Sequence, residues 1–165
     1  MGKIEMNKGH LIQAIIQSLN CDHQSLLRAA RAAHNAATDS ENSPDNKYET
    51  LALESSYIAQ GQANRASEIR KALDLYRSLP VKNFTAEDRV YLTALVAIES
   101  NQGYRRSFFL GPAAGGLKVV IDQEEVVVIT PDSPLGRDLL GKEVGDSVGV
   151  VVSDILTEYE LIALC

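Results

Sequence analysis

The chain has 165 residues and a net charge of −6, and 45% of its residues are hydrophobic, which is typical of a folded protein and excludes disorder along its whole length. No stretch approaches the roughly 20 apolar residues that span a bilayer, and residues 1–8 lack the apolar core of a signal peptide, so we expect a cytoplasmic protein without a membrane partner. The acidic balance disfavours independent binding to DNA, because such affinity comes from phosphate neutralisation by Lys and Arg.

The first predicted element is a long helix that covers residues 8–37. Residues 10–37 contain neither proline nor glycine, and apolar or small side chains recur there at alternating spacings of four and three. This spacing is typical of the seam of a coiled coil. The seam positions are Ile12, Ile16, Leu19, His23, Leu26, Ala30, Ala33 and Ala37.

A second helix of similar length follows and ends shortly before Pro80. Its seam positions are Ala52, Ser55, Ala59, Gln62, Ala66, Ile69, Leu73 and Tyr76. Two matched arms predict an antiparallel helical hairpin, whereas a larger bundle would need helices that the remaining sequence does not offer. The seam side chains become smaller towards the connection, which predicts a slim far end, widened on one face by Leu51, Leu53, Tyr57 and Ile58.

The connection between the arms, residues 38–49, is dense in turn-forming and helix-capping residues. Thr38 or Asp39 is expected to close the first helix, and Asp45 or Asn46 is expected to cap the second. This arrangement leaves several carboxylates at an exposed acidic tip.

Beyond Pro80 the pattern changes to short strands separated by clusters of Gly, Pro, Asp and Asn. The predicted strands are residues 90–99, 104–110, 125–130, 147–152 and 158–164, with a helix at residues 133–140. The fold class is therefore α+β, with a helical hairpin at residues 1–80 and a small antiparallel sheet domain at residues 81–165. Cys21 and Cys165 lie far apart without metal-site spacing, so no cofactor of the chain's own is expected.

The stretch from Ile129 to Asp146 reads ITPDSPLGRDLLGKEVGD. It closely resembles the signature S-P-L-G-x-x-L-L-G-K-x-x-G-D of the Gre family of bacterial transcription elongation and transcript cleavage factors. The valine-rich residues 148–152 and the segment from Tyr159 to Ile162 resemble the strands that follow this signature in the family.

The residues of this motif also have a purely structural interpretation, in which Ser133 caps a short helix, Pro134 occupies its first turn and Gly141 ends it. The family resemblance implies, in addition, an FKBP-like domain that docks at the rim of the RNA polymerase secondary channel. The expected contact is the corner formed by Pro131, Asp132, Ser133, Pro134, Leu135 and Gly136.

The predicted tip resembles the family's tip pattern D-x-x-E-N-x-x-Y only in part. Glu41 and Asn42 supply the E-N pair, but Asp39 precedes Glu41 by two positions instead of three, and a second register places Asp45 on the Glu position. The resemblance implies catalytic carboxylates that share a Mg²⁺ with the polymerase active site near the RNA 3′ end, since Mg²⁺ prefers oxygen ligands. Asp39 and Glu41 are the expected metal ligands, with Asp45 as the substitute.

Three functions remain open from the sequence. A cleavage factor would stimulate RNA hydrolysis by the polymerase without being an enzyme itself, whereas a regulator of the same architecture would occupy the secondary channel without supplying metal ligands. A prolyl isomerase would need a pocket lined by aromatic side chains, which is disfavoured because the chain has no Trp and only three Phe.

Overall fold

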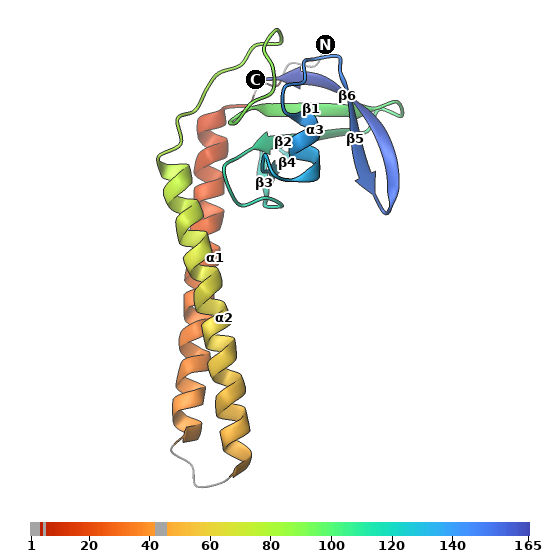
Figure 1. Cartoon of the computed structure of the whole chain (residues 1–165). Coiled ribbons are helices and arrows are strands. Elements are labelled where there is room, and N and C mark those ends of the chain that lie inside the picture. Colours follow the sequence, from red (N-terminus) through yellow and green to blue (C-terminus); the bar gives the residue numbers. More distant parts are fainter. Residues whose placement is uncertain (1–3, 5, 42–45) are drawn as a thin grey trace. The chain divides into compact units, whose positions relative to one another are not determined.

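The computed structural model describes residues 4, 6–41 and 46–165, with the side chains of residues 39–41, 46–49 and 152 excluded. Two long helices come first and are followed by six strands and a short third helix (Figure 1). The chain divides into two compact units, one containing Ile16–Asp74 and the other containing Met1–Ile15 together with Leu75–Cys165. The functional boundary between residues 80 and 81 stays a prediction.

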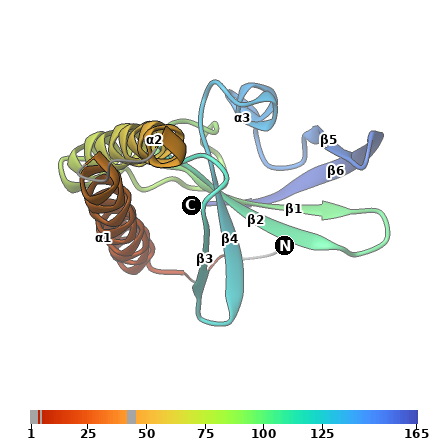
Figure 2. The ribbon, with the colours of Figure 1, turned by 90° about the horizontal axis from the view of Figure 1, so that it is seen from below.

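Helix α1 (Lys8–Glu41) and helix α2 (Asn46–Arg77) form the expected hairpin and lie side by side in both ribbon views (Figures 1 and 2). Helix α1 begins at an Asn7 cap, whose side-chain oxygen accepts hydrogen bonds from the N–H groups of Gly9 at 2.8 Å and His10 at 3.2 Å. Every predicted seam residue of both helices is buried or half-buried, so the periodicity identified the inner faces correctly.

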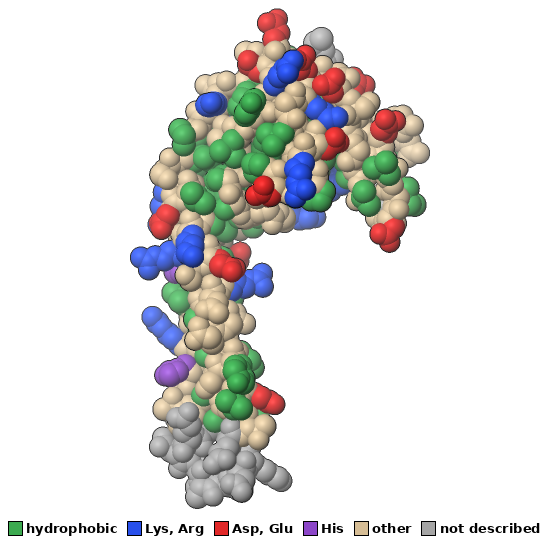
Figure 3. Space-filling view, viewed as in Figure 1, with side chains coloured by type: hydrophobic (Ala, Val, Ile, Leu, Met, Phe, Trp, Pro, Cys, Tyr) green, Lys and Arg blue, Asp and Glu red, His purple; other side chains and the backbone are tan. Residues whose placement is uncertain are grey.

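The alanine-rich part of the hairpin does not close completely. A groove of about 450 Å³ lies there, between residues of α1 such as Ala30 and His34 and residues of α2 such as Ser56 and Ala59. The four large side chains predicted to widen one face are exposed, and apolar atoms are visible on the outside of the helices in Figure 3.

The end of α1 differs from the prediction, because the helix continues through Thr38 and Asp39 to Glu41. The Thr38 hydroxyl does not close the helix but donates a hydrogen bond of 2.9 Å to the carbonyl oxygen of His34, four residues earlier. A threonine inside a helix can donate its hydroxyl hydrogen bond to the carbonyl four residues earlier. The hydroxyl of Thr38 is therefore not used to cap a helix end, and the helix continues.

The second unit is built on one six-stranded sheet with the order β3-β4-β2-β1-β6-β5. Its elements are β1 (Leu95–Ser100), β2 (Arg105–Leu110), β3 (Lys118–Ile121), β4 (Glu124–Ile129), α3 (Pro134–Leu139), β5 (Ser147–Val152) and β6 (Ile155–Leu164). The α+β class is confirmed. The sheet is not wholly antiparallel, because β2 and β4 pair in parallel, and its strong twist is visible in Figure 2.

Two strand predictions were wrong in detail. Strand β1 starts at Leu95 instead of residue 90, because Thr93 has a φ of 75° and Val90 instead exchanges hydrogen bonds with Gly141 and Lys142. Strand β3 was not predicted. It has four residues and joins β4 through Asp122 and Gln123, which both have positive φ. Glycine usually marks a turn of this kind, and this turn has none, so the sequence carries no signal for it.

The core of this unit lies between the sheet and α3. Strand β1 is central, and five of its six residues are buried. Leu139 from α3 is fully buried against the sheet, and Phe108 lies in the same cluster. The core residues are Val90, Ala94, Val96, Ile98, Phe108, Leu110, Ile129, Leu139, Val148, Val150, Tyr159, Leu161 and Leu164.

Tyr76, near the end of α2, is fixed against the loop that follows β2. Its hydroxyl donates a hydrogen bond of 2.8 Å to the carbonyl oxygen of Ala113, and burial raises the pKa of this phenol well above its usual value. Gly111 provides the space, because a Cβ at that position would lie 2.1 Å from the Tyr76 hydroxyl oxygen.

Replacing Tyr76 with phenylalanine is expected to lower the free energy of unfolding by about 1–2 kcal/mol, because the Ala113 carbonyl would lose its partner in a partly buried setting. Urea titration of the full chain measures the change. Tyr91→Phe is the matched control, since Tyr91 is exposed, and an equal loss in both variants would contradict the role of this hydrogen bond.

Candidate functional site

The motif that carries the family resemblance forms the corner between β4 and α3. Ser133 is the N-cap residue of α3 and has an extended conformation, with φ −68° and ψ 152°. Its hydroxyl oxygen accepts a hydrogen bond from the Gly136 N–H at 3.0 Å and donates one of 2.7 Å to the Thr130 carbonyl oxygen. Pro134 follows at the first helical turn, where a missing N–H costs nothing. The corner is therefore a tightly capped turn.

Gly136 is buried inside this corner. A Cβ on it would lie 1.9 Å from the Thr130 carbonyl oxygen and 2.8 Å from the Ser133 hydroxyl oxygen. The backbone of α3 can therefore approach the end of β4 only because residue 136 has no side chain.

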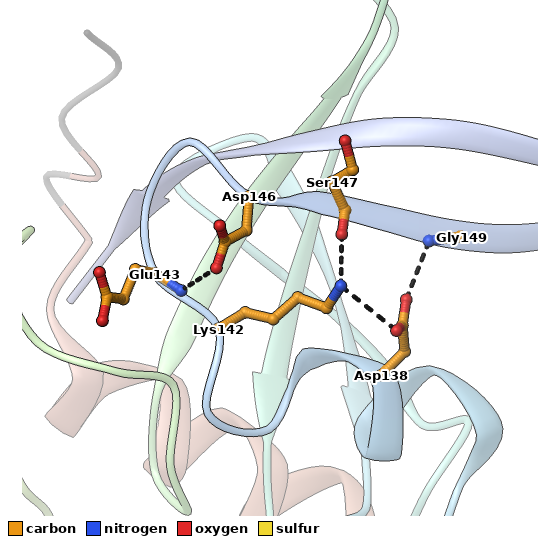
Figure 4. Close-up of polar contacts among 6 residues, drawn as sticks. All are labelled: Asp138, Lys142, Glu143, Asp146, Ser147 and Gly149. Carbon is orange, nitrogen blue, oxygen red and sulfur yellow. Dashed lines mark hydrogen bonds and ion pairs between the residues drawn. The ribbon is translucent and has the colours of Figure 1, made fainter.

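The end of α3 is fastened to β5 by polar contacts (Figure 4). One carboxylate oxygen of Asp138 accepts a hydrogen bond of 2.9 Å from the Gly149 N–H, and the other lies 3.3 Å from the Lys142 ammonium nitrogen. The same ammonium donates a hydrogen bond to the Ser147 carbonyl oxygen. Asp138 and Lys142 thus hold the helix against the strand.

The turn after α3 is held in a similar way. The Asp146 carboxylate accepts a hydrogen bond of 2.8 Å from the Glu143 N–H, and Gly145, with a φ of 99°, donates one of 2.8 Å to the Leu161 carbonyl oxygen. The Glu143 carboxylate lies 2.9 Å from the Arg89 Nε. Most polar groups of the motif therefore have structural partners.

The predicted contact residues fall into two groups. Gly136 is buried, and Pro131, Ser133 and Leu135 are half-buried, whereas Asp132 and Pro134 are exposed. Arg137 is also exposed, and its Nε donates a hydrogen bond of 3.0 Å to the Asp132 carbonyl oxygen. Sequence reasoning did not select Arg137 as a contact, although it lies within the quoted motif. The accessible chemistry of the corner is thus a carboxylate, a proline ring and a guanidinium.

A surface depression of about 640 Å³ is lined in part by Asp138 and Lys142. Its walls come from the end of α3, from β5 and from β6, and they combine charged groups with one apolar side chain. The lining residues are Asp138, Lys142, Ser147, Gly149, Leu156 and Glu158. The corner and this depression together form the candidate docking surface of the sheet unit.

Two of the three predicted catalytic residues lie in the part of the hairpin that the structure describes. Asp39 and Glu41 belong to the last turn of α1, with side chains outside the described set, and Asp45 lies outside the described residues altogether. Among the residues that the structure describes, no group of three His, Cys, Asp or Glu is placed to hold a metal ion. Carboxylates are nonetheless the ligand type that Mg²⁺ requires.

Lys8 was not singled out from the sequence, yet among the residues that the structure describes it is the one charged residue that is buried. Its ammonium donates a hydrogen bond of 2.6 Å to the Lys82 carbonyl oxygen and lies 4.7 Å from the centre of the Phe84 ring. Burial lowers the pKa of Lys8, and the nearby Cys165 thiol opposes this shift. The contacts join the start of α1 to residues 82–84, and nothing in the local sequence pattern signals them.

No protein-family model matches this sequence, and no curated protein matches it. Among solved structures, the chain is similar to GreA factor homolog 1 (Gfh1) of Thermus thermophilus, with 23% identity and a TM-score of 0.39 over 93% of this chain and 94% of that chain. For Gfh1 of Thermus aquaticus the identity is 21% and the TM-score is 0.38, over 98% of this chain and 96% of that chain.

The transcription elongation factor GreA/GreB from Nitrosomonas europaea is also similar, with 16% identity and a TM-score of 0.37 over 58% of this chain and 78% of that chain. TM-scores below 0.5 are too low for these likenesses to assign a function. Within the described part of the chain, neither long helix is apolar enough to cross a membrane.

Proposed function

We propose that this protein is an accessory factor of bacterial RNA polymerase that acts in the cytoplasm. The sheet unit docks at the rim of the polymerase secondary channel, and the helical hairpin enters that channel. The observation that carries the proposal is the motif from Ser133 to Asp146, which resembles the Gre signature. Together with the two residues before it, the start of this motif forms a capped corner in which Asp132 and Pro134 are exposed. The two matched helices, of 34 and 32 residues, supply an arm of roughly 50 Å at 1.5 Å per residue.

In the cleavage version of this function, the tip delivers carboxylates to the polymerase active site. Mg²⁺ there would activate water for attack on an RNA phosphodiester. Asp39 and Glu41 would hold that ion and orient the water, with Asp45 as the substitute ligand, close to the RNA 3′ end. The hydrolysis would remain the polymerase's own reaction, and this chain would stimulate it.

A second candidate is a regulator that occupies the secondary channel without promoting cleavage. The observation that favours it is the extension of α1 through Glu41, which places positions 39 and 41 in one helix. Helix positions two residues apart lie on different faces, so sharing one ion would require the end of α1 to unwind. The regulator would alter pausing or nucleotide entry instead.

One experiment separates both candidates from an unrelated function. The purified protein is mixed with a polymerase elongation complex that has been stalled by backtracking, and the RNA is resolved by length. Shortened RNA supports the cleavage factor, whereas altered pausing without shortening supports the regulator. An absence of polymerase binding in a co-sedimentation assay would contradict both.

The docking corner yields a prediction of its own. Asp132→Asn combined with Pro134→Ala is expected to weaken polymerase binding about tenfold, equivalent to about 1.4 kcal/mol, because both residues are exposed and available for contact. Titration of labelled polymerase measures the affinity. Glu87→Ala, which removes another exposed carboxylate of the same unit, is the control. Equal polymerase affinities for the native protein, the double variant and Glu87→Ala would place the polymerase contact elsewhere on the chain.

A further inference from the structure

Helix α2 carries four large apolar side chains that no part of the described chain covers. Two of them, Leu53 and Tyr57, are 56% and 70% exposed and lie one turn apart on the same side of the helix, and we call these two the outer patch; the other two, Leu51 and Ile58, are 53% and 56% exposed and lie on a different side. All four are concentrated within eight residues of one helix, and apolar side chains on the outside of the hairpin are visible in Figure 3. Contiguous exposed apolar surface of this kind commonly marks an interaction site.

Gly61 lies one turn beyond Tyr57 on the same helix. Among the described atoms, none lies within 4 Å of a Cβ built on Gly61, so no intrachain contact requires a glycine there. Glycine in an exposed helix interior is less favourable for the helix than alanine. A glycine is useful at such a position when another backbone or a large side chain approaches it closely.

Helix α2 also carries a second periodic series, opposite its inner face. Spacings of four and three residues alternate through this series, as in the seam of a coiled coil. All of its members are exposed, which shows that the series does not face α1. They are Thr50, Glu54, Tyr57, Gly61, Asn64 and Glu68.

The second series on one copy of α2 is complementary to the same series on another copy that runs in the opposite direction. If two copies of α2 run antiparallel with Tyr57 opposite Gly61 of the second copy, the same register sets Glu54 opposite Asn64 and Leu53 opposite Arg65 of that copy. The Tyr57 ring then fills the space beside the glycine. Each Glu54 carboxylate lies next to an Arg65 guanidinium, and the two-fold symmetry forms this opposite-charge pair twice.

We propose that a second copy of this chain covers the outer patch, forming an antiparallel α2 to α2 dimer. The dimer buries the Leu53 and Tyr57 side chains of both copies and is held in register by the two Glu54 to Arg65 pairs. The contact is small compared with a stable protein interface, so the dimer exchanges with monomer and depends on concentration. The proposal does not depend on polymerase binding.

Sedimentation velocity of the full chain over a wide concentration range tests the proposal. The native protein is expected to shift from monomer to dimer as its concentration rises. Glu54→Arg and Arg65→Glu should each weaken dimerisation by about tenfold or more, because each turns two attractive pairs into repulsive ones. A mixture of the two variants should dimerise again, since both cross-pairs are then of opposite charge, and the variant carrying both changes should dimerise alone.

Gly61→Ala provides an independent readout. Alanine should raise the melting temperature of the hairpin because it favours the helix, and it should weaken dimerisation because its methyl group occupies the space for Tyr57. A chain that is monomeric at every concentration would overturn the proposal. A dimer that is insensitive to the charge changes, or a variant mixture that stays monomeric, would overturn it as well.

Discussion

Replacing Gly136 with alanine is expected to destabilise the sheet unit by about 3 kcal/mol or more. The added Cβ would lie 1.9 Å from the backbone oxygen of Thr130, a contact that no side-chain rotation can relieve. The backbone of α3 must move, and that movement breaks the hydrogen bonds that Ser133 makes to Gly136 and Thr130. Overpacking of a tight site and loss of buried hydrogen bonds each cost about 1–3 kcal/mol.

Urea titration of the full chain would measure this loss, and Gly115→Ala is a well-matched control. A Cβ at Gly115 would make ordinary contacts of 3.4 Å or more with Thr130, so its stability should change by less than about 0.5 kcal/mol. A Gly136→Ala variant as stable as the Gly115→Ala variant would show that the corner tolerates a side chain. Because the expected effect is on folding, loss of polymerase binding in Gly136→Ala would not identify a contact residue.

The second large effect concerns the tip of the hairpin. If the protein stimulates RNA cleavage, Asp39→Asn combined with Glu41→Gln is expected to reduce the rate of RNA shortening by about 100-fold or more, equivalent to about 2.7 kcal/mol in the barrier. Both changes preserve side-chain size and remove only the negative charge that would hold the metal ion. Affinity for the polymerase should stay unchanged, because the proposed docking surface lies in the sheet unit.

Asp22→Asn is the control for this prediction, since it removes an exposed carboxylate from the same helix far from the tip in sequence. Asp45→Asn alone tests the second tip register: a strong loss of cleavage in this variant would make Asp45 the ligand in place of Asp39 or Glu41. Undiminished cleavage in the variant with both Asp39→Asn and Glu41→Gln would contradict the catalytic assignment. A native protein that binds the polymerase without shortening RNA would identify the regulator.

The helical hairpin was predictable because its signal is local. Alternating spacings of four and three residues identified the inner faces of both helices, and the seam from Ile12 to Ala37 is buried or half-buried throughout. The capped corner was predictable for a similar reason, because Ser133 and Pro134 have well-defined preferences at the start of a helix.

Other features escaped the sequence because the residues concerned carry no local signal for them or carry an opposing one. Strand β3 is short and lacks a glycine turn, and its pairing with β4 gives it a place in the sheet. The parallel pairing of β2 with β4 has no local signature, since a strand has the same periodicity in either direction. The continuation of α1 to Glu41 opposed the local preference of Thr38 and Asp39 for a helix end.

The sequence by itself determined the two helices with their inner faces, the α+β class and the position of the motif, because periodicity and capping act within a few residues. Only the tertiary structure decided which motif residues are available to a partner. Ser133 and Gly136 are engaged with Thr130, the residue after β4, and Asp138 and Lys142 are engaged with β5, while Asp132 and Pro134 remain exposed. The physical reason is that the exposure of each side chain depends on how the corner and α3 pack against the sheet, and that packing exists only once the sheet has formed.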